Sequence, residues 1–156
     1  MRIWNLEKYS ENIAFIDEYD NIVTYADLQM CEKEISQICS RCLVAILCHN
    51  NIGAAVGYIS FINNGIVPMM LNAHMDSKLL YNLFNTYKPS YVWCPTDEIE
   101  QFSYLNNKEV KYQAYKYSLV RMDYDSEYKL NNELALLLTT SGSTGALNLL
   151  YKAIKI

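Results

Sequence analysis

Short apolar runs alternate with segments of helical spacing along most of this chain. Four apolar runs have the length of strands that are buried on both faces. They cover residues 43–47, 66–71, 91–94 and 134–138. The segments 52–63 and 76–87 lie between them and have the length of helices. Strands separated by helices of about a dozen residues predict βαβ units, and therefore an α/β fold with a mostly parallel sheet flanked by helices.

The pattern before the first apolar run differs. Segments 14–17 and 22–24 are typical of a hairpin. Thr24 can cap a following helix, and Asp27 stands where the acid of a capping box belongs. Apolar residues then recur at helical spacing and predict one buried face. They are Leu28, Cys31, Ile35, Ile38 and Cys39.

Three further expectations concern the middle of the chain. Gly53 and Gly57 lie one turn apart on the predicted helix 52–63, so that helix can approach the sheet closely. Residues 96–107 are predicted as a helix. Residues 111–122 alternate enough to predict one strand with half-buried tyrosines.

A run of hydroxyls and glycines follows the last apolar run directly: Thr140, Ser141, Gly142, Ser143, Thr144 and Gly145. The glycines allow a tight bend that turns several N–H groups towards one point. Short hydroxyl donors without a carboxylate among them suit a polyanion such as the phosphates of a nucleotide. The spacing fits neither a Walker A loop nor a dinucleotide-binding turn. The alternative is a Ser/Gly-rich surface turn after a core strand.

Thr-Ser-Gly-Ser-Thr-Gly after an apolar strand resembles the phosphate loop of the adenylate-forming enzymes, the AMP-dependent synthetase and ligase superfamily. Thr24–Leu28 and Gly65–Pro68 resemble two further patterns of that family, in the same order. The resemblance implies that the chain is the first part of the large N-terminal domain of such an enzyme. It assigns Thr140 to Gly145 to ATP, and it assigns no catalytic or metal-binding residue.

The implied parent reaction activates a carboxylate with ATP, with magnesium expected, to give an acyl-adenylate. The acyl group then passes to the thiol of CoA or of a carrier protein, as in acyl-CoA synthetases. The partners implied are a small carboxylate and CoA or a carrier protein. The acyl substrate is not indicated by this sequence.

The chain departs from the family after Gly145, where x-Pro-Lys is usual and Ala146, Leu147 and Asn148 stand instead. We therefore divide the chain into 1–145, the N-terminal portion of an adenylation domain, and 146–156, an atypical tail. Residues 146–156 can be encoded so that the neighbouring frame reads Pro-Lys-Leu-Val, and a frameshift is one hypothesis for this tail. The expectation is a truncated ligase that is inactive by itself. The alternatives are a non-catalytic nucleotide-binding or interaction module, or one part of a split enzyme with a complementing polypeptide or self-association.

Composition and charge narrow the classes of function and of partner that remain. The net charge of -4 gives no electrostatic case for nucleic acid, and no run has the length of a membrane span. We expect a cytoplasmic protein without nucleic-acid or membrane partners. The odd number of cysteines, five, argues against a closed disulfide framework. Cys39-x-x-Cys42 has the spacing of a metal or redox pair, and buried free thiols are the simpler interpretation.

Overall fold

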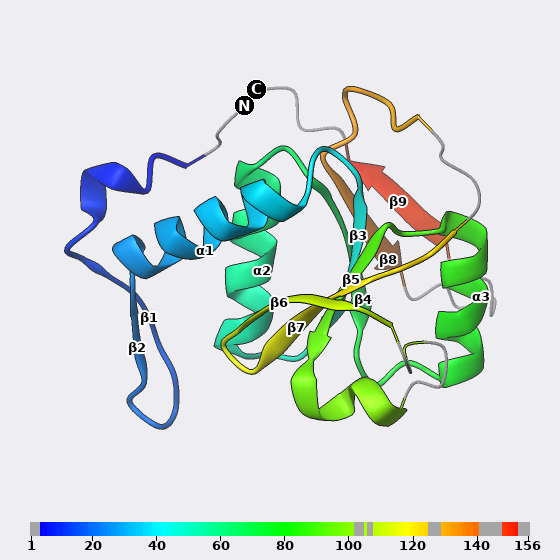
Figure 1. Ribbon diagram of the computed structural model, residues 1–156, viewed down its shortest axis with the longest axis horizontal. Coiled ribbons are helices and arrows are strands. Elements are labelled where there is room, and N and C mark those ends of the chain that lie inside the picture. Colours follow the sequence, from blue (N-terminus) through cyan, green and yellow to red (C-terminus); the bar gives the residue numbers. More distant parts are fainter. Residues whose placement is uncertain (1–3, 102–104, 106–107, 125–128, 141–147, 153–156) are drawn as a thin grey trace.

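A seven-stranded mixed sheet forms the centre of the fold in the computed structural model, which describes residues 4–101, 105, 108–124, 129–140 and 148–152 (Figure 1). The strands are β3 (Leu43–Cys48), β4 (Val67–Asn72), β5 (Tyr91–Pro95), β6 (Val110–Ala114), β7 (Tyr117–Arg121), β8 (Leu136–Thr140) and β9 (Asn148–Lys152). Their order is β6-β7-β5-β3-β4-β8-β9. The central four, from β5 to β8, run parallel, whereas β7 and β9 flank them in the antiparallel direction. The predicted α/β class is confirmed.

Helices cover both faces of the sheet (Figure 1). They are α1 (Tyr25–Ile38), α2 (Ile52–Asn63) and α3 (Ser77–Tyr87). Alternate residues of β3 enter separate cores: Val44 and Ile46 pack with α1 and α2, and Ala45 and Leu47 pack with α3. A strand buried on both faces has no polar side, which explains the continuous apolar run. None of the helices in the described residues is long and apolar enough to cross a membrane.

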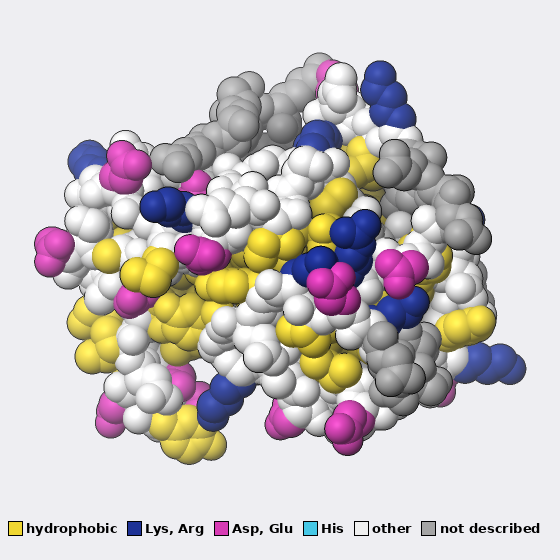
Figure 2. All heavy atoms as spheres, in the orientation of Figure 1, with side chains coloured by type: hydrophobic (Ala, Val, Ile, Leu, Met, Phe, Trp, Pro, Cys, Tyr) yellow, Lys and Arg dark blue, Asp and Glu magenta, His cyan; other side chains and the backbone are white. Residues whose placement is uncertain are grey.

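The N-terminal region forms a separate small sheet, as the pattern predicts. After a short 3-10 helix, η1 (Glu7–Tyr9), strands β1 (Ile13–Ile16) and β2 (Ile22–Thr24) pair antiparallel. Ile13, Ile16 and Ile22 are each more than half exposed at 51%, 58% and 56%, and Figure 2 shows apolar side chains along this hairpin. The hairpin therefore carries an exposed apolar surface.

The predicted capping box at the start of α1 is confirmed. The Thr24 hydroxyl accepts from the amide of Asp27 at 3.2 Å, and the Thr24 amide donates to the Asp27 carboxylate at 2.8 Å. The Thr24 hydroxyl also donates to that carboxylate at 2.7 Å. These bonds, with the hydroxyl as the largest cause, hold the pKa of Asp27 below its usual range.

We expect Thr24→Ala to lower the free energy of unfolding by about 1 kcal/mol at neutral pH, measured by urea denaturation. The contribution of Asp27 to stability is complete above the pKa of an aspartate in the unfolded chain. It is lost as the pH falls through the lowered pKa that Asp27 has in the folded protein. The difference between Thr24→Ala and the parent should therefore shrink below about pH 4. Thr24→Ser keeps the hydroxyl and serves as the control. An equal loss in both variants would contradict the capping role.

The close approach of α2 to the sheet, predicted from Gly53 and Gly57, is also confirmed. A Cβ placed on Gly57 would lie 2.3 Å from Nε1 of Trp93, and one on Gly53 would lie 2.3 Å from Cδ2 of Tyr117. The indole of Trp93 is fully buried and donates to the carbonyl of Gly53 at 2.9 Å. The two missing side chains thus make room for two aromatic rings of the sheet.

Two predicted elements are wrong, the first in its number of strands and the second in its type of helix. The single strand 111–122 is a hairpin of β6 and β7, because Tyr115 and Lys116 both have positive φ (51° and 61°) and turn the chain. The predicted helix 96–107 begins as a short 3-10 helix, η2 (Thr96–Gln101). Contacts to other elements hold this turn, since Thr96 bonds Ser118 and Glu98 bonds His49, both at 2.8 Å. Of the rest of 96–107, residues 102–104 and 106–107 lie outside the described residues.

Candidate functional site

The predicted phosphate-binding segment leaves the sheet at the carboxyl end of β8. Thr140 is the last residue of that strand. Ser141, Gly142, Ser143, Thr144 and Gly145 lie outside the described residues. On the other side of segment 141–147, β9 returns antiparallel to β8, with Asn148 opposite Thr140. Both ends of the segment are therefore held together at the carboxyl edge of the parallel strands.

An open cavity of about 610 Å³ lies at this same edge. It is lined by Cys48, His49, Asn50, Met70, Leu71, Asn72, His74, Leu138 and Thr139. These residues come from the ends of β3, β4 and β8 and from the loops that follow β3 and β4. In open α/β sheets the carboxyl ends of the strands are where ligands bind. The cavity and the end of β8, after which the predicted segment begins, thus lie at the same strand edge.

Two histidines give this edge its polar character. His49 Nε2 lies 2.8 Å from Glu98 Oε1, and both side chains are about a fifth exposed. The ring of His49 also meets the ring of His74 edge-on, with centroids 4.8 Å apart. The backbone around them is fixed: the amide of His49 donates to the hydroxyl of Tyr117 at 3.2 Å, and the amide of His74 donates to Asn72 Oδ1 at 2.8 Å.

Two further polar groups of the cavity, on Thr139 and Cys48, are engaged within the protein. The Thr139 hydroxyl donates to the carbonyl of Met70 at 3.5 Å. The thiol of Cys48 donates to the carbonyl of Ile46, and burial raises its pKa to about 11. Cys48 is therefore a protonated thiol at neutral pH and a poor nucleophile. The described part of the edge is therefore a cavity whose thiol is not an activated nucleophile.

Neither a metal site nor a disulfide is found in the part of the chain that the structure describes. Its residues include no cluster of three His, Cys, Asp or Glu side chains with metal-binding geometry. All five cysteines are free thiols: Cys31, Cys39 and Cys94 are buried, and Cys42 and Cys48 are half-buried.

Sequence reasoning did not assign the histidines and Glu98 to this edge. A signal for His49 and His74 was present, because each follows a predicted apolar strand within a few residues. Glu98 also follows a predicted apolar strand within a few residues, but its pairing with His49 depends on the neighbouring position of β3 and β5 in the sheet, which the sequence pattern does not give.

No protein-family model matches the sequence, and no curated protein matches it by sequence. The fold, in contrast, has clear counterparts among solved structures. The chain superposes on O-succinylbenzoate coenzyme A synthetase from Bacillus subtilis in complex with AMP with a TM-score of 0.62 and 18% identity, covering 95% of this chain and 41% of that one. MatB from Rhodopseudomonas palustris matches with a TM-score of 0.66 and 14% identity, over 92% of this chain and 32% of that one. A luciferase-like enzyme from the mealworm Zophobas morio matches with a TM-score of 0.66 and 16% identity, over 95% and 40%.

The chain therefore shares its fold with one part of each of these three enzymes. It spans 32% to 41% of the length of these three proteins.

Proposed function

We propose that this chain supplies the nucleotide-phosphate-binding part of an adenylate-forming ligase. The parent reaction would join a small carboxylate to the α-phosphate of ATP, release pyrophosphate, and pass the acyl group to the thiol of CoA or a carrier protein. The observation that carries this proposal is the place of Thr140. It ends a central parallel strand, at an edge that suits ligands, at the head of a segment composed of hydroxyls and glycines.

Two of the structurally similar proteins support ATP as the ligand. The synthetase from Bacillus subtilis has been crystallised with AMP and with ATP and magnesium ion, and MatB has been crystallised with ATP. In this chain the hydroxyls of Thr140, Ser141, Ser143 and Thr144 would donate to phosphate oxygens, and Gly142 and Gly145 would let backbone amides approach them. The segment contains no carboxylate, so a magnesium ion would need ligands from elsewhere.

We further propose that the 156-residue chain binds nucleotide without completing adenylation. Leu147 and Asn148 stand where the family places Pro-Lys, so the segment lacks the cation that would neutralise charge developing on the phosphates. A complementing polypeptide would supply that charge and the acyl pocket. We place this chemistry in the cytoplasm.

Isothermal titration calorimetry with ATP tests the binding step. Thr144→Ala removes one proposed hydroxyl donor, and we expect it to weaken ATP binding by about tenfold, because a hydrogen bond to a charged group is worth about 1.5 kcal/mol or more. Thr86→Ala is the matched control, since Thr86 is exposed on α3 and its hydroxyl bonds the Asn82 carbonyl in its own helix. Equal affinities of the two variants for ATP would overturn the proposed phosphate site.

A second candidate is a non-catalytic interaction module, which the exposed isoleucines of the β1–β2 hairpin favour. Carboxylate-dependent exchange of pyrophosphate into ATP distinguishes the candidates. Exchange by the purified chain would show that it is catalytic alone. Exchange only after addition of a complementing polypeptide would show a split enzyme.

A further inference from the structure

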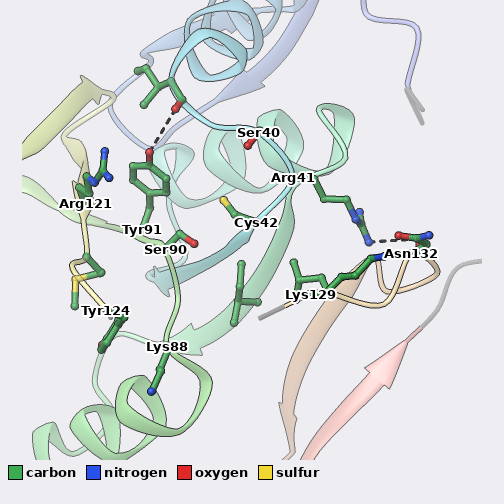
Figure 3. A pocket seen from close by; sticks show the side chains of 14 residues that line it. Ser40, Arg41, Cys42, Lys88, Ser90, Tyr91, Arg121, Tyr124, Lys129 and Asn132 are labelled. Carbon is green, nitrogen blue, oxygen red and sulfur yellow. Dashed lines mark hydrogen bonds between the residues drawn. The ribbon is translucent and has the colours of Figure 1, made fainter. Parts of the chain in front are cut away.

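A second cavity, of about 620 Å³, lies at the opposite edge of the sheet, where the parallel strands begin (Figure 3). Its lining comes from the starts of β3 and β5, from the ends of α1, α3 and β7, and from the connector that leads to β8. This volume is in the usual range for a pocket that binds a small molecule. The cavity lies at the other end of the strands from Thr140, so the proposed function leaves it unused.

Hydrogen bonds between distant parts of the chain fix two walls of this cavity. On one wall the guanidinium of Arg41 donates at 2.7 to 2.8 Å to three backbone carbonyls, those of Gly65, Asn131 and Leu134. These bonds tie the connector before β8 to the start of β3. On the other wall the amide of Ser90 donates to the carbonyl of Leu43 at 2.8 Å, and its carbonyl accepts from the amide of Met122 at 2.9 Å. The cavity is therefore pre-organised, which lowers the entropic cost of binding a ligand.

The charge of the cavity is cationic. Its described lining contains four of the 13 Lys and Arg residues of the chain and none of the 17 Asp and Glu residues. The four cations come from different elements and connections, as Figure 3 shows: Arg41, Lys88, Arg121 and Lys129. The chain as a whole carries a net charge of -4, so this lining is opposite in sign to the rest of the protein. A cavity lined by one sign of charge concentrates ions of the other sign, here anions.

Helix dipoles and the acids among the described residues do not account for all of this charge. Lys88 caps the C-terminus of α3, where a cation offsets the helix dipole. Arg121 ends a strand and Lys129 lies in a connector, so neither has that role. Asp123 lies 4.0 Å from Arg121, but its side chain is 72% exposed and is closer to Lys108, at 3.3 Å. Water and Lys108 therefore screen much of its effect on Arg121.

The backbone of Lys88 gives a second indication of function. Its φ is 45°, in the left-handed region, where the end of a helix usually carries glycine or asparagine. The Lys88 amide donates to the carbonyl of Phe84 at 2.8 Å, so this conformation closes the last turn of α3. Side chains in conformations that favour glycine are common at ligand sites. The strain at Lys88 therefore supports a functional role for its ammonium group.

The rest of the lining contributes hydroxyls and apolar surface. Ser40 and Ser90 carry hydroxyls, which can donate to an anion. The rings of Tyr91 and Tyr124 are half-buried. The hydroxyl of Tyr91 donates to the carbonyl of Ile38 at 3.4 Å, and its ring is left as a surface for packing. A ligand that matches this lining combines a multiply charged anionic group with an aromatic or apolar body.

We propose that this cavity binds a small organic phosphate with an aromatic body, at a site separate from the proposed ATP segment. The phosphate group binds to the side chains of Lys88, Arg121 and Lys129. A phosphate suits these donors, because it is a compact anion of almost two charges at neutral pH with several acceptor oxygens. The aromatic body packs against the rings of Tyr91 and Tyr124. Arg41 positions the connector that carries Lys129, since its guanidinium is bonded to backbone carbonyls.

Labelling with pyridoxal phosphate tests the site without a variant. Its aldehyde condenses with a nearby lysine amine with loss of water, borohydride fixes the product, and mass spectrometry maps the labelled lysines. We expect the faster of Lys88 and Lys129 to be labelled at least about tenfold faster than Lys78, which is exposed at the start of α3. Pyridoxal lacks the phosphate and should show no such preference. Labelling of all three lysines at one rate by pyridoxal phosphate would overturn the proposal.

Two variants test the cations. Arg121→Gln keeps both lysine targets and should slow their labelling by about tenfold, because it removes one charged donor to the phosphate. Lys33→Gln, at an exposed position of α1 outside the cavity, is the matched control and should not change the rate. Lys88→Gly should weaken the binding of phenyl phosphate, measured by calorimetry, by about tenfold. It should not lower the free energy of unfolding, because glycine adopts a positive φ without strain. Unchanged affinity in Lys88→Gly would contradict the proposal.

Competition tests the aromatic body and separates this site from the ATP segment. Phenyl phosphate should protect Lys88 and Lys129 from pyridoxal phosphate at a concentration about tenfold below that of inorganic phosphate. Equal protection by the two would remove the case for an aromatic body. Thr144→Ala, which is aimed at the ATP segment, should leave the labelling unchanged. Loss of labelling in Thr144→Ala would show that the probe binds at the ATP segment instead.

Discussion

Gly57→Ala is expected to lower the free energy of unfolding by about 3 kcal/mol or to prevent folding. The new Cβ would lie 2.3 Å from Nε1 and 2.5 Å from Cδ1 of Trp93, far inside van der Waals contact. The indole cannot move aside easily, because it is fully buried and bonded to the carbonyl of Gly53. Overpacking of this kind typically costs 1–3 kcal/mol, occasionally more. Urea denaturation followed by tryptophan fluorescence and circular dichroism measures the loss.

The control is the reverse substitution, alanine to glycine, at a position of α2 that is not crowded by the sheet. Ala55→Gly, on the same helix and only half-buried, should cost about 1 kcal/mol through backbone entropy alone. Gly57→Ala gains that same helix propensity, so any net loss measures the clash with Trp93. A Gly57→Ala variant as stable as the parent would show that α2 does not approach the sheet as closely as described.

Asn63→Leu is expected to cost about 2–4 kcal/mol. Asn63 is 2% exposed, and its amide nitrogen donates to the carboxylate of Glu32 at 2.9 Å and to the carbonyl of Trp4 at 3.1 Å. Its oxygen accepts from the amide of Trp4 at 2.9 Å. Glu32 is itself only 4% exposed, so loss of this donor leaves a buried carboxylate less well compensated. Chemical denaturation at neutral pH gives the change in unfolding free energy.

A double-mutant cycle separates this polar contact from simple repacking. Replacing both partners, Glu32→Leu with Asn63→Leu, removes the buried charge together with its donor. We expect the double variant to be more stable than the sum of the two single losses predicts, by about 1–3 kcal/mol. Strict additivity would show that Asn63 and Glu32 contribute independently.

The sequence predicted those helices and strands that are determined by their own residues or by the residues next to them. The apolar run 43–47 became β3, and the predicted helix 52–63 has the bounds of α2. The Thr24–Asp27 capping box and the stop of α3 before Pro89 also follow from neighbouring residues, with Asp76 capping the start of α3. Parallel pairing followed from the alternation of strands and helices.

The remaining features depend on tertiary contacts that a linear pattern does not contain. The turn at Tyr115 and Lys116 has two non-glycine residues at positive φ, so it lacks the Asn-Gly or Asp-Gly signal of a two-residue hairpin. Strand β9 was not predicted, because it depends on pairing with β8, a contact that the residues of β9 alone do not indicate. The resemblance to the adenylate-forming enzymes predicted the fold, which is confirmed, whereas the phosphate-binding role of Thr140 to Gly145 stays a prediction.

The hydrogen bond between His49 and Glu98 has a consequence for ligand access. The connection that leaves β3 runs towards β4, and the one that leaves β5 runs the other way, towards β7. Such a divergence normally opens a crevice between the two strand ends. Here the imidazole and the carboxylate bridge it at 2.8 Å, with the Tyr117 hydroxyl behind them on the amide of His49. The gap between the ends of β3 and β5 is therefore closed, and the open cavity lies beside it at the ends of β3, β4 and β8.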